Sequence, residues 1–126
     1  MENENVIFSY TRQDALNDGI FIDVTETAKE AGIKYPVAVT TNLYNKWIKP
    51  SEALKKMGQD ERGRLWDVIW MFRNAARKTK DSFVEFEVIF LNDQEKPETV
   101  TIWAAIEAQS PTDPSPGINI LLPEDY

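Results

Sequence analysis

The 126-residue sequence contains neither cysteine nor histidine. It therefore has no thiol nucleophile, no imidazole base and no disulfide bond, and it lacks the usual zinc ligands. No glycine-rich phosphate loop, GxSxG elbow or HExxH-type spacing occurs either. Catalysis would have to depend on carboxylates, lysine, tyrosine or serine. We therefore expect a protein that is not an enzyme and that uses no cofactor and no metal.

Long apolar runs are also missing. No stretch approaches the roughly 18 apolar residues of a membrane-spanning helix. The first residues, MENENVIF, are acidic and polar, unlike a secretory signal. The expected location is the cytoplasm, without membrane contact. With 126 residues, 42% of them hydrophobic, the chain can bury one core, and we expect a single domain over residues 1–126.

The net charge of −7 is distributed unevenly along the sequence. Residues 1–33 hold seven acidic and two basic side chains, and residues 34–80 hold four acidic and eleven basic ones. Residues 81–126 hold ten acidic side chains and one basic side chain. Two interpretations remain open: attraction between the middle third and its flanks within the fold, or two functional faces of opposite sign.

Cap and stop signals divide the first half into short elements. Thr11 and Asp14 have the spacing of a capping box, and Asp23 and Glu26 repeat it. With later caps at Thr40 or Thr41 and at Ser51, these signals predict short helices ending near residues 17, 31, 49 and 57. Short apolar runs predict extended segments at residues 6–8, 20–22 and 37–39.

The second half predicts one long helix followed by strands. Leu65, Ile69, Phe72 and Ala76 lie on one face of a helix over residues 61–79. Residues 83–91 and 99–107 then alternate with the period of strands.

Antiparallel pairing of these two strands with Phe86 opposite Ala104 places their apolar residues on one face. The segment SPTDPSPG, residues 110–117, predicts a turn because three prolines do not fit a central strand, and residues 118–122 predict a third strand. The predicted fold class is α+β: short capped helices and one long amphipathic helix packed on a three-stranded antiparallel sheet.

The chain resembles a family of uncharacterised proteins of plasmids, integrative elements and prophages, often labelled plasmid-related protein. The resemblance lies in IFSYTRQDALNDGIFIDVTETAKEAGIKYPVAVT at 7–40, DERGRLWDVIWM at 60–71 and INILLPEDY at the C-terminus, so it covers a whole domain. The chain departs from the family in the loop at 50–59, the hairpin turn and SPTDPSPG. No activity is established for the family. The resemblance implies a mobile-element setting, which favours proteins that restrain host defences or regulate the element.

One candidate partner-binding site is a second stripe on the long helix. Trp66, Trp70, Arg73 and Arg77 flank its apolar face. Tryptophan and arginine are common in protein hot spots, and they also form base-stacking platforms with phosphate contacts. The structural alternative is that the tryptophans complete the core and the arginine stems pack over them.

A second candidate lies in the acidic N-terminal third. Asp14, Asp23 and Glu26 are explained by capping and the helix dipole, which leaves Asp18 and Glu30 unassigned. Together these carboxylates could form an anionic surface that resembles a phosphate track.

Glu85 and Glu87 are a weaker candidate. Paired carboxylates can bind Mg²⁺ or transfer protons. The predicted cross-strand neighbours, Trp103 and Ala105, supply no further oxygen ligand, so we interpret this pair as part of a solvated sheet face.

These observations favour a small binding protein of a mobile element that acts by occupying a protein partner. The concrete hypothesis is an inhibitor of a nucleic-acid-handling defence complex, of the CRISPR or restriction type, whose acidic surfaces meet a basic channel. The alternative is a nucleic-acid-binding regulator that uses the basic middle helix. The isoelectric point near 4.6 favours the first, and no tight direct DNA binding is expected. An enzyme with a carboxylate-based site ranks third.

Overall fold

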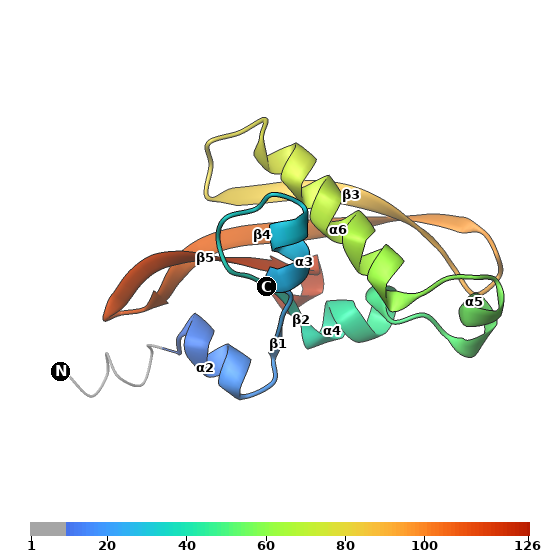
Figure 1. Cartoon of the computed structure of the whole chain (residues 1–126), viewed down its shortest axis with the longest axis horizontal. Helices are drawn as coiled ribbons and strands as arrows, with labels where there is room; N and C mark the ends of the chain where they lie inside the picture. Colours follow the sequence, from blue (N-terminus) through green and yellow to red (C-terminus); the bar gives the residue numbers. More distant parts are fainter. Residues whose placement is uncertain (1–9) are drawn as a thin grey trace.

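A five-stranded mixed sheet organises the molecule, as shown in a computed structural model that describes residues 10–126 (Figure 1). The strand order is β1-β2-β5-β4-β3. Neighbouring strands are antiparallel except β2 and β5, which are parallel. The strands are β1 (Phe21–Asp23), β2 (Val37–Thr40), β3 (Phe83–Leu91), β4 (Pro97–Ser110) and β5 (Asp113–Leu121).

The helices are short except for one. They are α2 (Arg12–Asn17), α3 (Thr25–Glu30), α4 (Thr41–Leu43) with a π-helical turn η1 (Tyr44–Ile48), α5 (Glu52–Lys56), α6 (Glu61–Ala76) and a 3₁₀ turn η2 (Pro123–Asp125). Helices α3 and α6 lie on one face of the sheet, with α6 across β3 (Figure 1). In the described part of the chain, no helix has the length and apolarity that crossing a membrane requires.

Local caps explain where most of these helices begin. The predicted capping box is confirmed at α2, because the side chains of Thr11 and Asp14 each accept a hydrogen bond from the other's backbone amide. The predicted box at α3 is wrong. Its N-cap is Val24, and the Asp23 carboxylate instead accepts a hydrogen bond from the Thr25 amide.

The predicted three-stranded antiparallel sheet is wrong. The runs near residues 20–22 and 37–39 join the sheet as β1 and β2, and the run at 6–8 lies outside the described residues. Val37 pairs with Ile118 and Val39 with Ile120, about 80 positions further along the chain. All of β2 is buried. A short apolar strand that is buried on both faces has no alternation that would reveal its partner.

The predicted register of β3 and β4 is wrong by two residues. Phe86 lies opposite Ile102, and Ala104 lies opposite Val84. The faces are nevertheless as predicted, because side chains alternate with a period of two. The loop decides the register: the Asn92 amide donates to the Lys96 carbonyl at 2.8 Å, which closes a hairpin tighter than the sequence suggested.

The turn in the proline-rich segment, residues 110–117, is shorter than predicted. Pro114 and Pro116 lie within β5, which begins at Asp113. At these positions β5 has only β4 as a neighbour, because β2 pairs with residues 118–120. A proline there removes no hydrogen bond from a central strand, which is why the segment can be extended.

The core lies between the sheet and the layer of α3 and α6. The predicted apolar face of α6 is confirmed: Leu65, Ile69 and Phe72 are buried in the main cluster. The Phe72 ring lies 6.0 Å from that of Phe86 on β3. This packing turns the even-numbered residues of β3 and β4 inward and leaves the odd-numbered ones on the opposite face of the sheet.

Candidate functional site

Helix α2 covers one half of that opposite face. Arg12 is 3% exposed and lies against β4 and β5. Its Nε donates to Asn119 Oδ1 at 2.7 Å, and its Nη1 donates to Gln109 Oε1 at 2.9 Å. Gly117 provides the space, because a Cβ at this position would lie 2.5 Å from Arg12 Nε. Burial lowers the pKa of the Arg12 guanidinium. These contacts fix α2 over β5 and the end of β4.

In residues 10–126 no α-helix covers the other half of this face, and the 3₁₀ turn η2 lies at one end of it. We call it the open face and define it by the odd-numbered side chains of β3 and the first part of β4: Phe83, Glu85, Glu87, Ile89, Thr99, Thr101 and Trp103. Ile89 is 65% exposed. Two of these side chains are carboxylates and none is basic, so the open face is acidic as well as partly apolar.

Three aromatic rings form a cluster at one end of the open face. Phe83, Trp103 and Tyr126 meet edge to face, with centroids 5.3, 5.8 and 5.6 Å apart. Trp103 Nε1 also donates to Glu85 Oε1 at 2.8 Å across the strand pair. Tyr126 is 80% exposed. Edge-to-face packing orders these rings, while Phe83 and Tyr126 stay exposed to solvent and available for other contacts.

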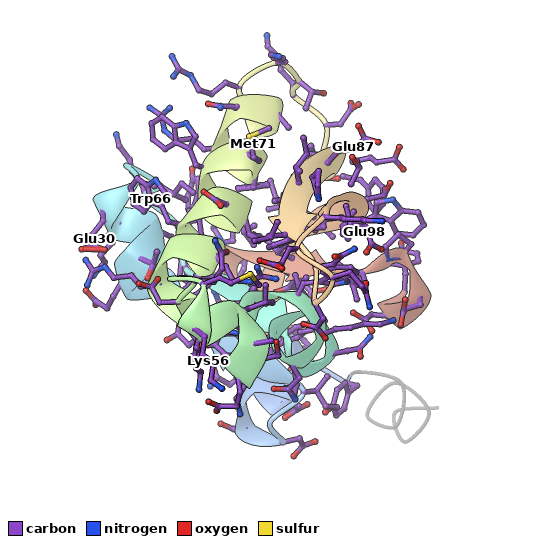
Figure 2. The ribbon with its side chains drawn as sticks, turned by 90° about the vertical axis from the view of Figure 1, so that its right-hand side faces the viewer. Glu30, Lys56, Trp66, Met71, Glu87 and Glu98 are labelled. Carbon is purple, nitrogen blue, oxygen red and sulfur yellow. The ribbon has the colours of Figure 1, made fainter. Side chains whose placement is uncertain are left out.

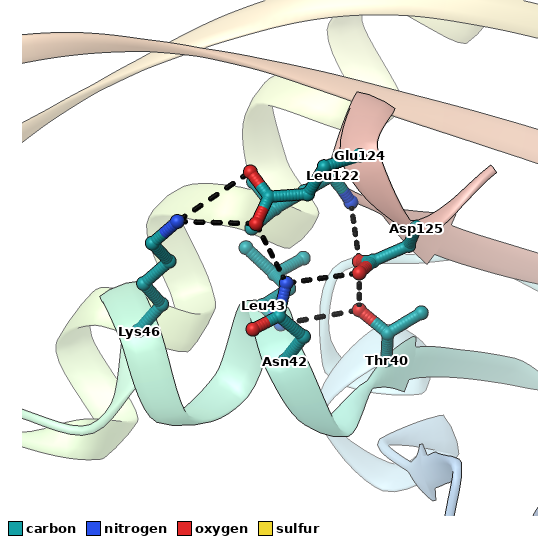
Figure 3. A network of polar contacts seen from close by, with 7 residues as sticks. All are labelled: Thr40, Asn42, Leu43, Lys46, Leu122, Glu124 and Asp125. Carbon is teal, nitrogen blue, oxygen red and sulfur yellow. Dashed lines mark hydrogen bonds and ion pairs between the residues drawn. The ribbon is translucent and has the colours of Figure 1, made fainter.

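A polar latch holds the turn that precedes Tyr126, and Figure 3 shows its residues Thr40, Asn42, Lys46, Glu124 and Asp125. Asp125 Oδ2 accepts from Thr40 Oγ1 at 2.7 Å, and Asp125 Oδ1 accepts from Asn42 Nδ2 at 2.9 Å. Glu124 Oε2 accepts from Asn42 Nδ2 and pairs with Lys46 Nζ, both at 3.1 Å. The hydrogen bonds from Asn42 and Lys46 lower the pKa of the Glu124 carboxyl. The latch therefore ties the last turn of the chain to α4 and η1.

The predicted aromatic and basic stripe is present on α6. The Trp66 and Trp70 rings stack at 5.7 Å, and the Arg73 guanidinium lies 4.8 Å from the Trp70 ring centroid. Trp66 packs partly against the core, whereas Trp70 is 38% exposed. Arg77 is exposed at the C-terminal end of α6. Each interpretation therefore holds for one tryptophan: Trp66 packs at the edge of the core, and Trp70 lies at the surface.

The two acidic candidates lie apart. Asp18 accepts a hydrogen bond from Tyr10 Oη at 2.7 Å, which raises the pKa of Tyr10 to about 12. Glu30 pairs with Arg62 Nη2 at 3.0 Å. Asp18 ends α2 on the covered half of one face, and Glu30 ends α3 on the other side of the sheet. They do not form one anionic track.

Part of the basic middle third is used inside the fold. Arg64 is 4% exposed, and its guanidinium lies 4.9 Å from the Phe90 ring centroid. Its Nε donates to the Trp47 carbonyl at 2.8 Å, and its Nη1 donates to the Leu91 carbonyl at 3.2 Å. Burial lowers the pKa of this guanidinium. Arg64 therefore joins η1, α6 and β3 instead of contributing to a basic surface.

Residues 1–126 match the model described as Family of unknown function (DUF6573). The chain belongs to this family. Neither the curated proteins nor the solved structures contain a match to the chain. The description of DUF6573 names no activity and no plasmid or prophage, so the mobile-element setting stays a prediction, and function must be argued from the surface.

The sequence of this DUF6573 protein gave a partial signal for the open face. Alternation already predicts Trp103 on the solvated face beside the two carboxylates, and a large aromatic where a polar side chain is usual is the signal that this face offers. Tyr126 gave no such signal, because its position depends on the latch to α4. Among the described residues, no three histidine, cysteine, aspartate or glutamate side chains group as metal ligands would.

Proposed function

We propose that this DUF6573 protein is a non-catalytic binding module whose open face recognises a basic surface of a protein partner. The observation that carries the proposal is the combination of exposed aromatic rings with Glu85 and Glu87, without a basic side chain on the same face. Aromatic rings and carboxylates together suit arginine and lysine, which stack on the ring and pair with the acid.

The surface also has the composition of an interface. Phe83, Ile89 and Tyr126 are large hydrophobic side chains exposed to solvent beside the partly buried Trp103. Exposed apolar area that is rimmed by charge marks binding surfaces more often than isolated exposed residues do. Trp103 and the two rings that meet it edge to face are already ordered by the latch and by the hydrogen bond to Glu85. Pre-ordering lowers the entropy lost on binding.

We extend the proposal to the setting that the resemblance implies. The partner would then be a nucleic-acid-handling defence complex of the CRISPR or restriction type, and the protein would occupy its basic channel. Charge complementarity of this kind steers association.

The alternative function is a nucleic-acid-binding regulator that uses the basic helix. The stacking of Arg73 on Trp70 favours it. The burial of Arg64 and the pairing of Arg62 with Glu30 weigh against it, because both reduce the charge available to phosphates. We expect duplex DNA to bind no tighter than about 10⁻⁴ M at physiological salt. Sub-micromolar binding in a fluorescence titration, lost in Arg73→Ala and Arg77→Ala, would favour the alternative.

The test of the proposed function is a selection of displayed random peptides on the immobilised protein. We expect the binders to be rich in lysine and arginine. The variant Glu85→Lys/Glu87→Lys should weaken them at least about tenfold, which corresponds to about 1.4 kcal/mol.

The matched control is Glu26→Lys/Glu52→Lys, which makes the same change in charge at two exposed helix positions away from the open face. Exposed ion pairs of this kind contribute little to stability, so this control should fold and bind normally. Equal binding by both double variants would contradict the proposal, as would a selection without basic residues.

A further inference from the structure

Within residues 10–126, strand β3 is an edge of the sheet, and one side of its backbone has no strand partner. At its two ends the Ile106 amide donates to the Ser82 carbonyl at 2.9 Å, and the Asn92 amide donates to the Lys96 carbonyl at 2.8 Å. In an antiparallel ladder the bonded residues alternate, so the even-numbered residues of β3 bond to β4. The amides and carbonyls of Glu85, Glu87 and Ile89 therefore point away from the sheet.

In residues 10–126 this edge is protected by the charge of Glu85 and Glu87, but it lacks the structural forms of protection. Edge strands are commonly blunted by proline, bulges, short length or a covering element. β3 extends over nine residues without proline, and its register with β4 is unbroken. At the far end, the Leu91 carbonyl is taken by Arg64. The free part of the edge is thus the stretch beside the open face.

A groove of about 550 Å³ accompanies the edge. Asp67, Trp70 and Met71 line it from α6, and Glu87, Val88 and Ile89 line it from β3 together with Thr99 of β4. Figure 2 shows Met71 on the side of α6 that faces Glu87, whereas Trp66 is on the side of α3. Met71 and Trp70 are both exposed, so the groove has an apolar wall on the helix side.

Charge decides between the occupants of this edge. Symmetric antiparallel pairing of two β3 strands places Glu87 opposite its own copy when centred on residue 87, and opposite Glu85 of the second chain when centred on residue 86. Centred on residue 88, it still sets all four carboxylates on one face of the strand pair. Like charges directly opposite each other destabilise a strand pair. A strand with basic side chains at the corresponding positions would instead pair with both carboxylates.

We propose that β3 accepts an extended segment of a basic protein as a sixth strand. Lysine or arginine at every second position would lie beside Glu85 and Glu87 on the open face. Apolar side chains at the intervening positions would enter the groove with Trp70 and Met71. Such strand addition draws affinity from backbone hydrogen bonds and specificity from alternate side chains. The inference rests on the proposed function and names its binding mode.

The test uses proline at position 89. Because the Ile89 amide points outward, Ile89→Pro removes a hydrogen-bond donor to the added strand and leaves the ladder with β4 intact, as edge prolines do. Ile89→Ala is the matched control, since it removes the same side chain and keeps the amide. The probes are nine-residue peptides that alternate Lys or Arg with Val, Leu or Phe, and binding is measured by fluorescence anisotropy.

We expect Ile89→Ala to weaken these peptides only through the lost side chain, and Ile89→Pro to bind them at least about tenfold more weakly than Ile89→Ala does. A peptide N-methylated at the amides that would face β3 should lose as much on the unaltered protein. This second arm remains decisive should Ile89→Pro fail to fold, which circular dichroism would reveal.

Equal binding by Ile89→Pro and Ile89→Ala, or by methylated and unmethylated peptides, would overturn strand addition. The proposed function would survive that result provided that Glu85→Lys/Glu87→Lys still weakens binding. Failure of every alternating peptide to bind would also overturn strand addition. A concentration-dependent dimer in sedimentation, abolished by Ile89→Pro, would identify the occupant as a second copy of this chain.

Discussion

Arg12 and Gly117 form a pair that neither residue reveals in the sequence. An arginine in a short N-terminal helix is usually exposed, yet this one is buried against β5 and hydrogen-bonded by its side chain to Asn119 and Gln109. Its position requires a residue without a Cβ on the neighbouring strand. The contact joins positions about 105 apart in the chain, so local patterns carry no signal for it.

We predict that Gly117→Ala destabilises the fold by about 1–3 kcal/mol, the usual cost of overpacking. In an Arg12→Ala background the same substitution should cost much less, because the atoms it would meet are gone. Urea unfolding of the four proteins in this double-mutant cycle measures the difference. Additive free energies of unfolding would show that the two residues are not coupled.

Glu124 predicts a pH dependence of the latch. Its pKa is lowered in the folded protein by hydrogen bonds from Asn42 and Lys46, from an ordinary value of 4.5. A lowered pKa means that the contribution to stability is present above about pH 4.5 and is lost as the pH falls through the folded-state pKa.

Thermal unfolding of the original chain and of Glu124→Gln measures this contribution. The original chain should have the higher melting temperature at pH 7, and the difference in melting temperature between the two proteins should decrease below pH 4.5. A difference in melting temperature that stays constant down to pH 3 would contradict an ionised Glu124 in the latch.

At the scale of elements, local spacing predicted most helix starts, with the capping box at α3 as an error, but it did not predict which strands pair. Thr11, Ser51 and Asp60 cap helices through hydrogen bonds to residues three positions away, and such spacing can be read directly. The parallel pairing of β2 with β5 depends on which buried strand lies beside which. No periodicity within either strand specifies that choice.

The register of β3 and β4 can be tested by engineered disulfides, since the chain has no cysteine of its own. Glu87 and Thr101 are directly opposite and are not a hydrogen-bonded pair, which brings their Cα atoms to about 4.5 Å. We predict that Glu87→Cys/Thr101→Cys oxidises readily and that Glu87→Cys/Trp103→Cys does not. Non-reducing mass spectrometry distinguishes them. The opposite result would restore the register predicted from the sequence.

For the whole molecule, both interpretations of the charge pattern describe part of it. Arg62 with Glu30 and Lys46 with Glu124 join the basic middle third to its acidic flanks. Glu85 and Glu87 have no basic neighbour on the open face. The charges of the three segments of the sequence already indicate internal pairs of this kind. That Glu85 and Glu87 lack a basic neighbour is visible only from the order of the strands, which leaves β3 at an edge of the sheet.

Part of the candidate site could be predicted from local sequence patterns, and part could not. Alternation placed Glu85 and Glu87 on a solvated face. Helical spacing placed Trp70 and Arg73 on one stripe of α6 but left open whether the tryptophan completes the core or lies at the surface. Neither pattern could reveal that the open face ends in a ring cluster, because Tyr126 reaches it through the latch. Functional surfaces assembled from distant segments are not visible to local periodicity.

The most direct test of the open face is a chemical-shift map of the isotope-labelled protein with the tightest selected peptide. The Trp103 indole N–H, hydrogen-bonded to Glu85, is the most informative single signal. We predict that this signal and the amides of Glu85, Glu87 and Ile89 shift on binding, while those of α2 and α3 do not. Shifts confined to Trp66, Trp70 and Arg73, with an unchanged Trp103 indole, would contradict binding at the open face.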